Sequence, residues 1–562
     1  MRSASRRDEQ VRRNNRVRAA AWIGAAVALS FVLRVPFLRV PLTTDEGGYA
    51  YVARRWLAGQ GDLYADLWFD RPQGIFLAYG MILHTLGGDV VAIRLGAWVV
   101  AALTLLLVWA FARDAIGPRA AGPAAVLFAL IASSPAIEGF TANAEMFMAL
   151  PAAGTAWLLL RASRGGWGDK TLLAAGFLAG LATLLKPSGV VMLPLAIAFI
   201  WLVGPGGFMP VARRWTGVAA GFSLAILPAL AHGWLTGWSD FVFAVTYRVH
   251  HRSATTVTLE EHLGALRDLV NMIWPLLVAL ALPLAAWWLW SGPDNRDTRD
   301  TRWPRAETGV LRLVASRPPV KPGTEADILL RLWLLACLAG IAMGGNWFPH
   351  YVAQIAAPFA IWIALLLNQL TDRLPTLLWR SLSGLVVAAL LLPYSVVIAT
   401  EGDVEAMGER IFNHKTYAAQ DEIAAYLRAC TPPETPVYVA FYQASLYYLA
   451  DRPAAYRHLY RWELLELPGT AEDLIEMVRS PSRPLYVVDL GQQAPFADGG
   501  AAFWRAVAEN YHLETTIEGL PIYRADESDS RSSASPARCP EPSTLATSER
   551  GDSDREPESR RG

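Results

Sequence analysis

The stretch PLTTDEGGYAYVARRWLAGQGDLYADLWFDRPQG, residues 41–74, directly follows an apolar run that is long enough to cross a membrane. Asp45 and Glu46 therefore come close to the predicted membrane exit, where an unpaired carboxylate is costly and tends to be functional. Asp70 and Arg71 add a second acid and a fixed cation in the same loop. This pattern indicates a polar site at one end of a membrane-spanning bundle.

Composition supports a membrane protein. The chain has 562 residues, of which 53% are hydrophobic and 18% charged, whereas a soluble protein usually carries about 25% charged residues. Apolar runs close to the roughly 20 residues that a spanning helix needs recur along the first 400 positions. We therefore predict a polytopic α-helical membrane protein with eleven transmembrane helices, near residues 19–40, 90–112, 119–137, 144–162, 171–186, 188–204, 215–235, 270–290, 328–345, 350–370 and 378–399.

The distribution of Lys and Arg predicts which end of the bundle faces the cytoplasm. Residues 1–18 hold seven arginines, which by the positive-inside rule places the N-terminus inside. The basic loop 291–327 then also falls inside, whereas loop 41–88 and everything after residue 400 fall outside. We expect a multi-pass protein of the inner or plasma membrane, whose first apolar segment is an anchor rather than a cleaved signal. The net charge of zero gives no global field that would attract nucleic acid.

The composition and residue pattern of the sequence change after the last apolar run. Short β-branched and aromatic runs alternate with segments of helical periodicity over residues 415–525, which predicts a small extracytoplasmic α/β domain. Residues 526–562 are rich in Ser, Pro and charge and are predicted to be disordered. The 291–327 loop has a similar composition and is predicted to be flexible. The three cysteines match neither a disulfide framework nor a metal-binding spacing.

The stretch after Pro41 carries a helix-start signal. Thr43 followed by Glu46 is a capping-box pattern, and the next apolar residues recur at helical spacing, which predicts an amphipathic helix in the outer membrane interface. Asp45 and Glu46 are therefore open to two interpretations, as helix-capping acids or as site residues. Gly47 and Gly48 weaken a helix by about 1 kcal/mol each, so we expect close approach of a ligand or of another backbone at these positions.

Further polar residues fall on the same predicted outer side, and each also has a structural interpretation. Glu145 could be an N-terminal helix carboxylate, Lys186 could reach the lipid headgroups, and His350 could be a structural histidine at the interface. His250 and Arg252 fit either a solvated loop or a phosphate-attracting patch. The full set comprises Glu138, Asn143, Glu145, Lys186, Arg248, His250, His251, Arg252, His350 and Tyr351.

Together these residues suit one chemistry. Carboxylates can act as a general base toward an acceptor hydroxyl or amine, a guanidinium can stabilise a departing phosphate, and grooves between spanning helices can hold a lipid tail. A phosphate-linked lipid that carries a transferable group meets all three demands. No cofactor is required, although Asp45, Asp70 and Glu145 could bind a divalent cation such as Mg²⁺ or Mn²⁺ through oxygen ligands.

The motifs DEGGYAYVARRWLAGQGDLY, FDRPQG, TANAE, LLKPSG and FPHYVAQIAAP occur in this order. The combination resembles bacterial membrane glycosyltransferases of the GT-C fold, in particular the Rgt-type and aminoarabinose-transferase-type relatives of protein O-mannosyltransferases. The resemblance covers roughly residues 20–400, so residues 19–400 would form the GT-C domain. It implies transfer of a sugar from a polyprenyl-phosphate donor to a lipid, glycan or protein acceptor of the cell envelope, on the outer side of the membrane.

The resemblance also implies residue roles. Asp45 matches the catalytic aspartate of the first loop, and Asp70-Arg71-Pro72 matches an acid–Lys–Pro element whose cation holds the donor phosphate, with Arg in place of Lys. Glu145 or Asn143 matches a second acidic position. We accordingly expect catalytic roles for Asp45, Glu46 and Glu145, donor-phosphate contacts from Asp70, Arg71, Tyr49, Lys186, His350 and Tyr351, and acceptor or other contacts from Asn143, His250 and Arg252.

Two other classes of function remain open from the sequence. A transporter or flippase for a lipid-linked or anionic solute would favour charges at the membrane midplane and an inverted repeat. The charges here gather at one face, and no repeat is visible. The third class is a non-catalytic binding subunit that uses the 415–525 domain.

Overall fold

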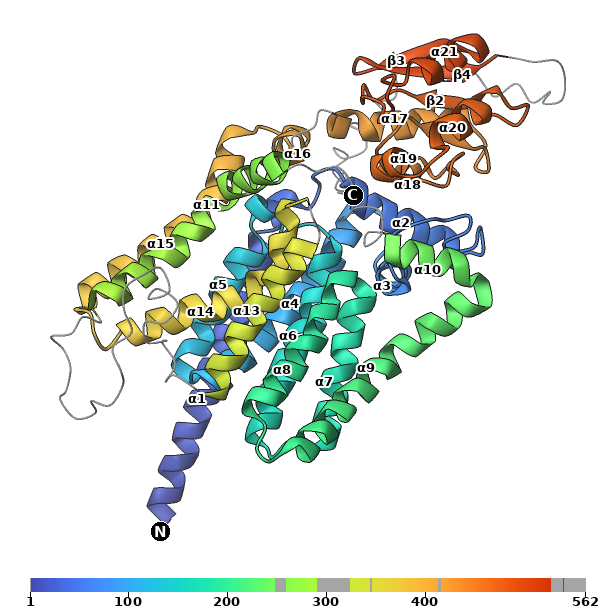
Figure 1. Cartoon of the computed structure of the whole chain (residues 1–562). Coiled ribbons are helices and arrows are strands. Elements are labelled where there is room, and N and C mark those ends of the chain that lie inside the picture. Colours follow the sequence, from blue (N-terminus) through green and yellow to red (C-terminus); the bar gives the residue numbers. More distant parts are fainter. Residues whose placement is uncertain are drawn as a thin grey trace, which may run out of the picture.

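The computed structural model shows a bundle of apolar helices with a small α/β region at one end (Figure 1). It confirms the predicted fold class, a multi-pass α-helical membrane protein with a small C-terminal sheet region. The segment 291–323 of the predicted flexible loop and nearly all of the predicted disordered tail lie outside the described residues. The structure describes residues 2–247, 259–290, 324–343, 346–412, 416–526 and 539.

The bundle differs from the prediction in the lengths of its helices. Each of the eleven predicted spans falls on a helix, but eight helical segments in the described ranges are long and apolar enough to cross a membrane, one of them Pro349–Leu370, which joins a short 3-10 helix to α14. The other three, α5, α7 and α8, fall short of that length, although α7 ends at Leu185, close to its predicted end, because the residue before a proline disfavours helical geometry. The helices are α1 (Arg2–Val32), α3 (Gln73–Thr85), α4 (Val90–Ala115), α5 (Pro118–Ala132), α6 (Ala144–Arg164), α7 (Asp169–Leu185), α8 (Met192–Val203), α9 (Phe208–Thr236), α10 (Trp238–Tyr247), α11 (Leu259–Trp290), α13 (Glu325–Met343), α14 (Ala356–Leu370) and α15 (Thr376–Thr400).

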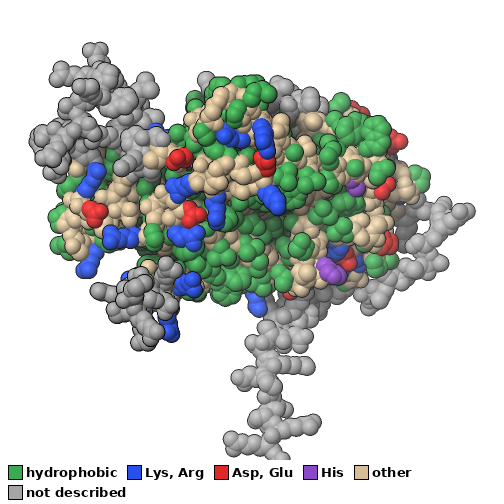
Figure 2. Space-filling view, turned by 90° about the horizontal axis from the view of Figure 1, so that it is seen from below, with side chains coloured by type: hydrophobic (Ala, Val, Ile, Leu, Met, Phe, Trp, Pro, Cys, Tyr) green, Lys and Arg blue, Asp and Glu red, His purple; other side chains and the backbone are tan. Residues whose placement is uncertain are grey.

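The two ends of the bundle differ in charge. Helices α4 and α6 end, and α5, α7 and α9 begin, at one end of the bundle, where Arg113, Arg161, Arg164, Lys170 and Arg213 lie. Figure 2 views the molecule from below and shows Lys and Arg side chains set among hydrophobic ones. The opposite ends of α6 and α7 carry Glu145 and Lys186 and face the α/β region.

The C-terminal region packs helices against a four-stranded sheet. The strand order is β1-β2-β4-β3, with β1 and β2 parallel and the other two pairs antiparallel. Strands β1, β2 and β4 fall on the three predicted runs, whereas β3 was not predicted. The elements are α16 (Val404–Phe412), α17 (Thr416–Cys430), β1 (Val437–Val439), α18 (Ser445–Ala450), α19 (Arg461–Glu466), α20 (Thr470–Arg479), β2 (Tyr486–Val488), α21 (Ala501–Asn510), β3 (Tyr511–Ile517) and β4 (Leu520–Ala525).

Helix α2 (Thr44–Leu57) joins the two parts. It begins with the predicted capping box, in which Thr43 and Glu46 bond each other's backbone. Its environment differs from the prediction, because α2 does not lie exposed in the membrane interface. The helix packs against α3 on the bundle and against α18 of the C-terminal region, and most of its residues are buried.

Gly47 and Gly48 allow this close packing. A Cβ atom on Gly47 would lie 2.2 Å from the Cα of Ser445, and one on Gly48 would lie 2.2 Å from the Tyr460 hydroxyl. Hydrogen bonds complete the seam, since Ala444 N donates to Thr44 Oγ1 at 2.9 Å and Tyr460 Oη donates to the Thr44 carbonyl at 3.1 Å. The expected close approach of another backbone is therefore found, and that backbone belongs to the C-terminal region.

We expect Gly47→Ala to destabilise the protein, although alanine favours a helix interior by about 1 kcal/mol. The new methyl group would collide with backbone atoms of Ser445, which cannot move as a flexible side chain would. Gly384→Ala in α15 is the matched control, because nothing lies within 4 Å of that Cβ position. Thermal unfolding in detergent should show a lower midpoint for Gly47→Ala alone. A Gly47→Ala protein as stable as the control would contradict this packing.

Candidate active site

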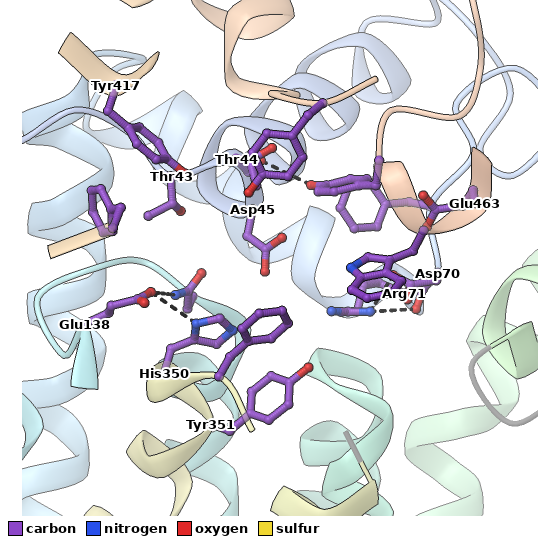
Figure 3. A pocket seen from close by; sticks show the side chains of 17 residues that line it. Thr43, Thr44, Asp45, Asp70, Arg71, Glu138, His350, Tyr351, Tyr417 and Glu463 are labelled. Carbon is purple, nitrogen blue, oxygen red and sulfur yellow. Dashed lines mark hydrogen bonds and ion pairs between the residues drawn. The ribbon is translucent and has the colours of Figure 1, made fainter. Parts of the chain in front are cut away.

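A pocket of about 180 Å³ opens between the acidic end of the bundle and the C-terminal region. Four segments that are distant in sequence form its wall: the first loop with α2, the turn before α6, the segment before α14, and the C-terminal region (Figure 3). The lining residues are Thr43, Thr44, Asp45, Phe69, Asp70, Arg71, Glu138, Asn143, Phe348, His350, Tyr351, Phe412, Tyr417, Tyr442, Tyr460, Trp462 and Glu463.

Asp45 points into the space between the bundle and the C-terminal region (Figure 3). It occupies the second position of α2, where the capping role is already filled by Thr43. Its side chain is half-buried, and its carboxylate has no hydrogen bond or ion pair with any residue that the structure describes. An unpaired carboxylate in a partly closed pocket is suited to accept a proton.

Glu46 follows in sequence but does not reach the pocket. Its carboxylate is fully buried and accepts from Arg94 Nε and Nη2 at 2.7 and 2.8 Å, from Thr43 N at 3.0 Å and from Ala142 N at 2.6 Å. These four bonds occupy both oxygens. The expected catalytic role of Glu46 stays a prediction, whereas the contacts in this structure are structural ones: Glu46 ties α2 to α4 and to the turn before α6.

Arg71 lies opposite Asp45 in the pocket wall. Its guanidinium pairs with the Asp70 carboxylate, and its Nη1 also donates to the Asp70 carbonyl at 3.1 Å. Burial alone lowers the pKa of Arg71, but the Asp70 carboxylate, with Tyr49 and Asp45, raises that pKa well above its ordinary value. Its buried Nε makes no hydrogen bond within the described residues. A charged guanidinium with a spare donor can hold a phosphate.

A second cluster of charged side chains lies at the base of the pocket. His350 Nδ1 lies 3.1 Å from Glu138 Oε2, and His350 Nε2 lies 3.8 Å from Glu145 Oε1. Glu145 also pairs with Lys186, whose ammonium lies 4.0 Å from the centre of the Tyr351 ring. Lys186 is thus buried rather than extended to the lipid headgroups, and Glu145 lies behind the pocket wall as its partner. Because Glu145 does not line the pocket, its expected catalytic role stays a prediction; in this structure it pairs with Lys186 and lies close to His350.

Two of the segments that form the pocket, the turn before α6 and the segment before α14, each contain a residue with strained backbone geometry. Glu138 and Trp347 adopt left-handed φ values of 50° and 53°, which cost a residue with a Cβ about 1–2 kcal/mol. Buried Arg34 stabilises the first turn by donating to the carbonyls of Ala132 and Gly139, each at 2.7 Å. Such strain is often found where a side chain must be aimed at a site.

The structure separates the expected residues into two groups. Asp45, Asp70, Arg71, Asn143, His350 and Tyr351 line the pocket. Glu46, Tyr49, Glu145 and Lys186 do not line it, and the Tyr49 ring packs against Phe69 and Tyr79. His250 and Arg252 lie outside the described residues.

Several important residues were not assigned roles from sequence. Arg94 interrupts the apolar run VVAIRLGAWVV, and a charge inside a spanning helix was a usable signal for a buried partner. The sequence offered no comparable signal for the residues that the C-terminal region contributes to the pocket. Within the described residues, no group of three or more His, Cys, Asp or Glu side chains is arranged to hold a metal ion.

We expect Glu46→Gln to lower stability strongly, because removing one partner of a buried ion pair leaves Arg94 uncompensated, at a cost of about 3–5 kcal/mol. Asp45→Asn should unfold like the wild type, because the Asp45 carboxylate has no partner in the part of the chain that the structure describes. Thermal unfolding of the two variants at matched expression tests this difference. Equal midpoints for Glu46→Gln and the wild type would rule out the structural role of Glu46.

Comparison with known proteins bears on the family and on the fold. Residues 70–232 match the model of the dolichyl-phosphate-mannose-protein mannosyltransferase family. No curated protein matches the chain in sequence. The crystal structure of ArnT from Cupriavidus metallidurans bound to undecaprenyl phosphate superposes with a TM-score of 0.58 at 15% identity, covering 90% of this chain and 97% of that one. The apo form gives a TM-score of 0.57 at 16% identity, covering 90% and 98%.

The resemblance noted in the sequence thus extends to the fold, and to more than the part of the chain that carries the motifs. Because the superposition covers nine-tenths of the chain, it includes at least part of the C-terminal region as well as the bundle. The chain has the GT-C fold of membrane glycosyltransferases.

Proposed function

We propose that this chain is an integral membrane glycosyltransferase that moves a sugar from a polyprenyl-phosphate donor to a lipid, glycan or protein acceptor of the cell envelope. The observation that carries the proposal is the Asp45 carboxylate, which has no partner among the described residues and shares one pocket with the charged Arg71 guanidinium. The family match and the shared fold support the same assignment.

The proposed reaction is a displacement at the anomeric carbon. Arg71 binds the phosphate of the donor and keeps its spare Nε–H for a phosphate oxygen. Asp45 accepts the proton of the acceptor hydroxyl or amine as that atom bonds to the anomeric carbon. The bond from this carbon to the phosphate oxygen breaks, and its electron pair leaves with the polyprenyl phosphate, whose added charge Arg71 stabilises.

The surrounding groups have positioning roles in this scheme. Asp70 holds the Arg71 guanidinium in one orientation, and Glu138 with Glu145 holds the His350 ring between two carboxylates. The pocket lies at the end of the bundle opposite to Arg161, Arg164 and Lys170. By the positive-inside rule we infer that the basic end is cytoplasmic and that the pocket and the C-terminal region face the outside.

One assay distinguishes the proposed glycosyltransferase from the rival class, a transporter of a lipid-linked solute. Purified protein is incubated with polyprenyl-phosphate donors labelled in the lipid and with envelope extract as a source of acceptor. A glycosyltransferase releases free polyprenyl phosphate, whereas a transporter leaves the donor intact. An unchanged donor, under conditions in which the lipid binds, would overturn the proposed function.

We expect Asp45→Asn to lose sugar transfer by about 10²–10⁴-fold, the usual contribution of a general base. Asparagine keeps the shape of the side chain but cannot take up the proton, so donor binding and folding should persist. Asp62→Asn is the matched control, because Asp62 is exposed in the same loop and does not line the pocket. The measurement is the rate of sugar transfer by each variant at matched expression. If Asp45→Asn kept half of the wild-type rate, another group would have to be the base.

We expect Arg71→Ala to weaken donor binding and turnover severely, and Arg71→Lys to restore both in part, because lysine keeps the charge but loses the planar fork. Binding of undecaprenyl phosphate to the purified variants gives the measurement. Arg213→Ala, an exposed arginine near the start of α9 at the basic end, is the control. Wild-type lipid affinity in Arg71→Ala would show that the phosphate binds elsewhere.

A further inference from the structure

The C-terminal region contributes an aromatic wall to the pocket. Tyr417, Tyr442, Tyr460 and Trp462 line it, together with the carboxylate of Glu463, and we call these four rings the aromatic roof. The bundle side of the same pocket carries the charged residues Asp45, Arg71, Glu138 and His350. Rings line both sides, since Phe69, Phe348 and Tyr351 belong to the bundle side, but most of the charged groups lie below, and the roof adds one carboxylate above.

The roof is held in a fixed position relative to Asp45. Tyr460 donates to the Thr44 carbonyl at 3.1 Å, one residue before Asp45, and its ring meets Phe69 edge-on with centroids 5.1 Å apart. The glycine at position 48 leaves the space that the Tyr460 hydroxyl occupies. Helix α19, which carries Trp462 and Glu463, is attached to α10 by the hydrogen bond from Tyr247 to Glu466 at 2.5 Å.

The roof also lies close to the proposed reaction centre. The charges of Asp45, Glu463 and Arg71 all act on the Tyr460 phenol, whose pKa is raised mainly by burial, so the phenol stays neutral. Figure 3 shows Glu463 on the same side of the pocket as Asp70 and Arg71. Tyr442, Tyr460 and Trp462 are half-buried, so parts of these side chains remain accessible from the pocket.

A donor bound through Arg71 must direct its sugar ring away from the guanidinium. The anomeric carbon has to lie between the phosphate and Asp45, so the rest of the ring extends toward the roof. Aromatic faces stack well against the C–H faces of a sugar ring, and a carboxylate accepts charge-assisted hydrogen bonds from sugar hydroxyls. A lipid tail would be a poor occupant of this space, because the same pocket carries several charged groups.

Resting on the proposed function, we propose that the C-terminal region forms the sugar-selecting half of the active site. Tyr460 and Trp462 pack against the ring of the donor sugar, and Glu463 accepts hydrogen bonds from its hydroxyl groups. A site that hydrogen-bonds a particular hydroxyl rejects sugars that lack it or present it elsewhere. The bundle therefore recognises the phosphate that all donors share, and the roof recognises the sugar.

The test compares the bare carrier with sugar-bearing carriers. Binding of full-length protein in nanodiscs is measured for undecaprenyl phosphate and for undecaprenyl phosphate carrying glucose, galactose, mannose or arabinose. The wild type should bind at least one sugar-bearing lipid about tenfold or more tighter than the bare lipid. Trp462→Ala and Glu463→Gln should each reduce this preference toward unity and leave the affinity for undecaprenyl phosphate unchanged. Glu472→Gln, at an exposed position of α20, is the control and should keep the preference.

Three outcomes would overturn the proposal: a wild type that binds all five lipids alike, variants that keep the wild-type preference, or variants that lose bare-lipid affinity by the same factor. The last would indicate a purely structural role. Failure of the proposed function looks different, because the bare lipid would then bind without dependence on Arg71.

Discussion

The buried ion pair between Glu46 and Arg94 is the constraint on which the site depends. Both side chains are fully buried, and two bonds of 2.7 and 2.8 Å join them. Arg94 also donates to the carbonyls of Phe37 and Pro41, at 3.1 and 3.2 Å, while Glu46 accepts from Ala142 N. One pair thus fixes the end of the first span, the start of α2, helix α4 and the turn before α6. Such pairs add little net stability but penalise every arrangement that breaks them.

This constraint explains how neighbouring acids come to have different roles. Successive helical residues point about 100° apart, so burying Glu46 against Arg94 turns Asp45 toward the open side of α2. The same helix carries Gly47 and Gly48, whose missing side chains admit the backbone of Ser445 and the hydroxyl of Tyr460. The carboxylate proposed as the base and the roof proposed to select the sugar are therefore held by one short helix. Relative movement of bundle and C-terminal region would disturb both together.

The sequence was informative where the signal is local. The capping box, the end of α7 before Pro187 and the alternation of strands and helices after residue 415 follow from short-range preferences and agree with the structure. The pairing of Glu46 with Arg94 spans 48 positions, and Tyr460 meets Thr44 across 416. No periodicity encodes such contacts. Residue type alone could not distinguish Glu46 and Glu145 from Asp45. Each glutamate differs from Asp45 in pairing with a cation that is distant in sequence, Arg94 or Lys186. The role of the glycines could be stated only in general terms, since the approaching backbone lay outside the local sequence.

A structure with undecaprenyl phosphate bound would test the proposed site most directly. We expect the phosphate group within hydrogen-bonding distance, about 3 Å, of the Arg71 guanidinium, in the pocket that Asp45 enters and beneath Tyr460. The lipid tail should leave this pocket along the bundle, and the C-terminal region should remain docked on α2. A phosphate bound at the opposite end of the bundle, beside Arg161 and Arg164, would contradict the account, because Asp45 could not then reach the bond that must break.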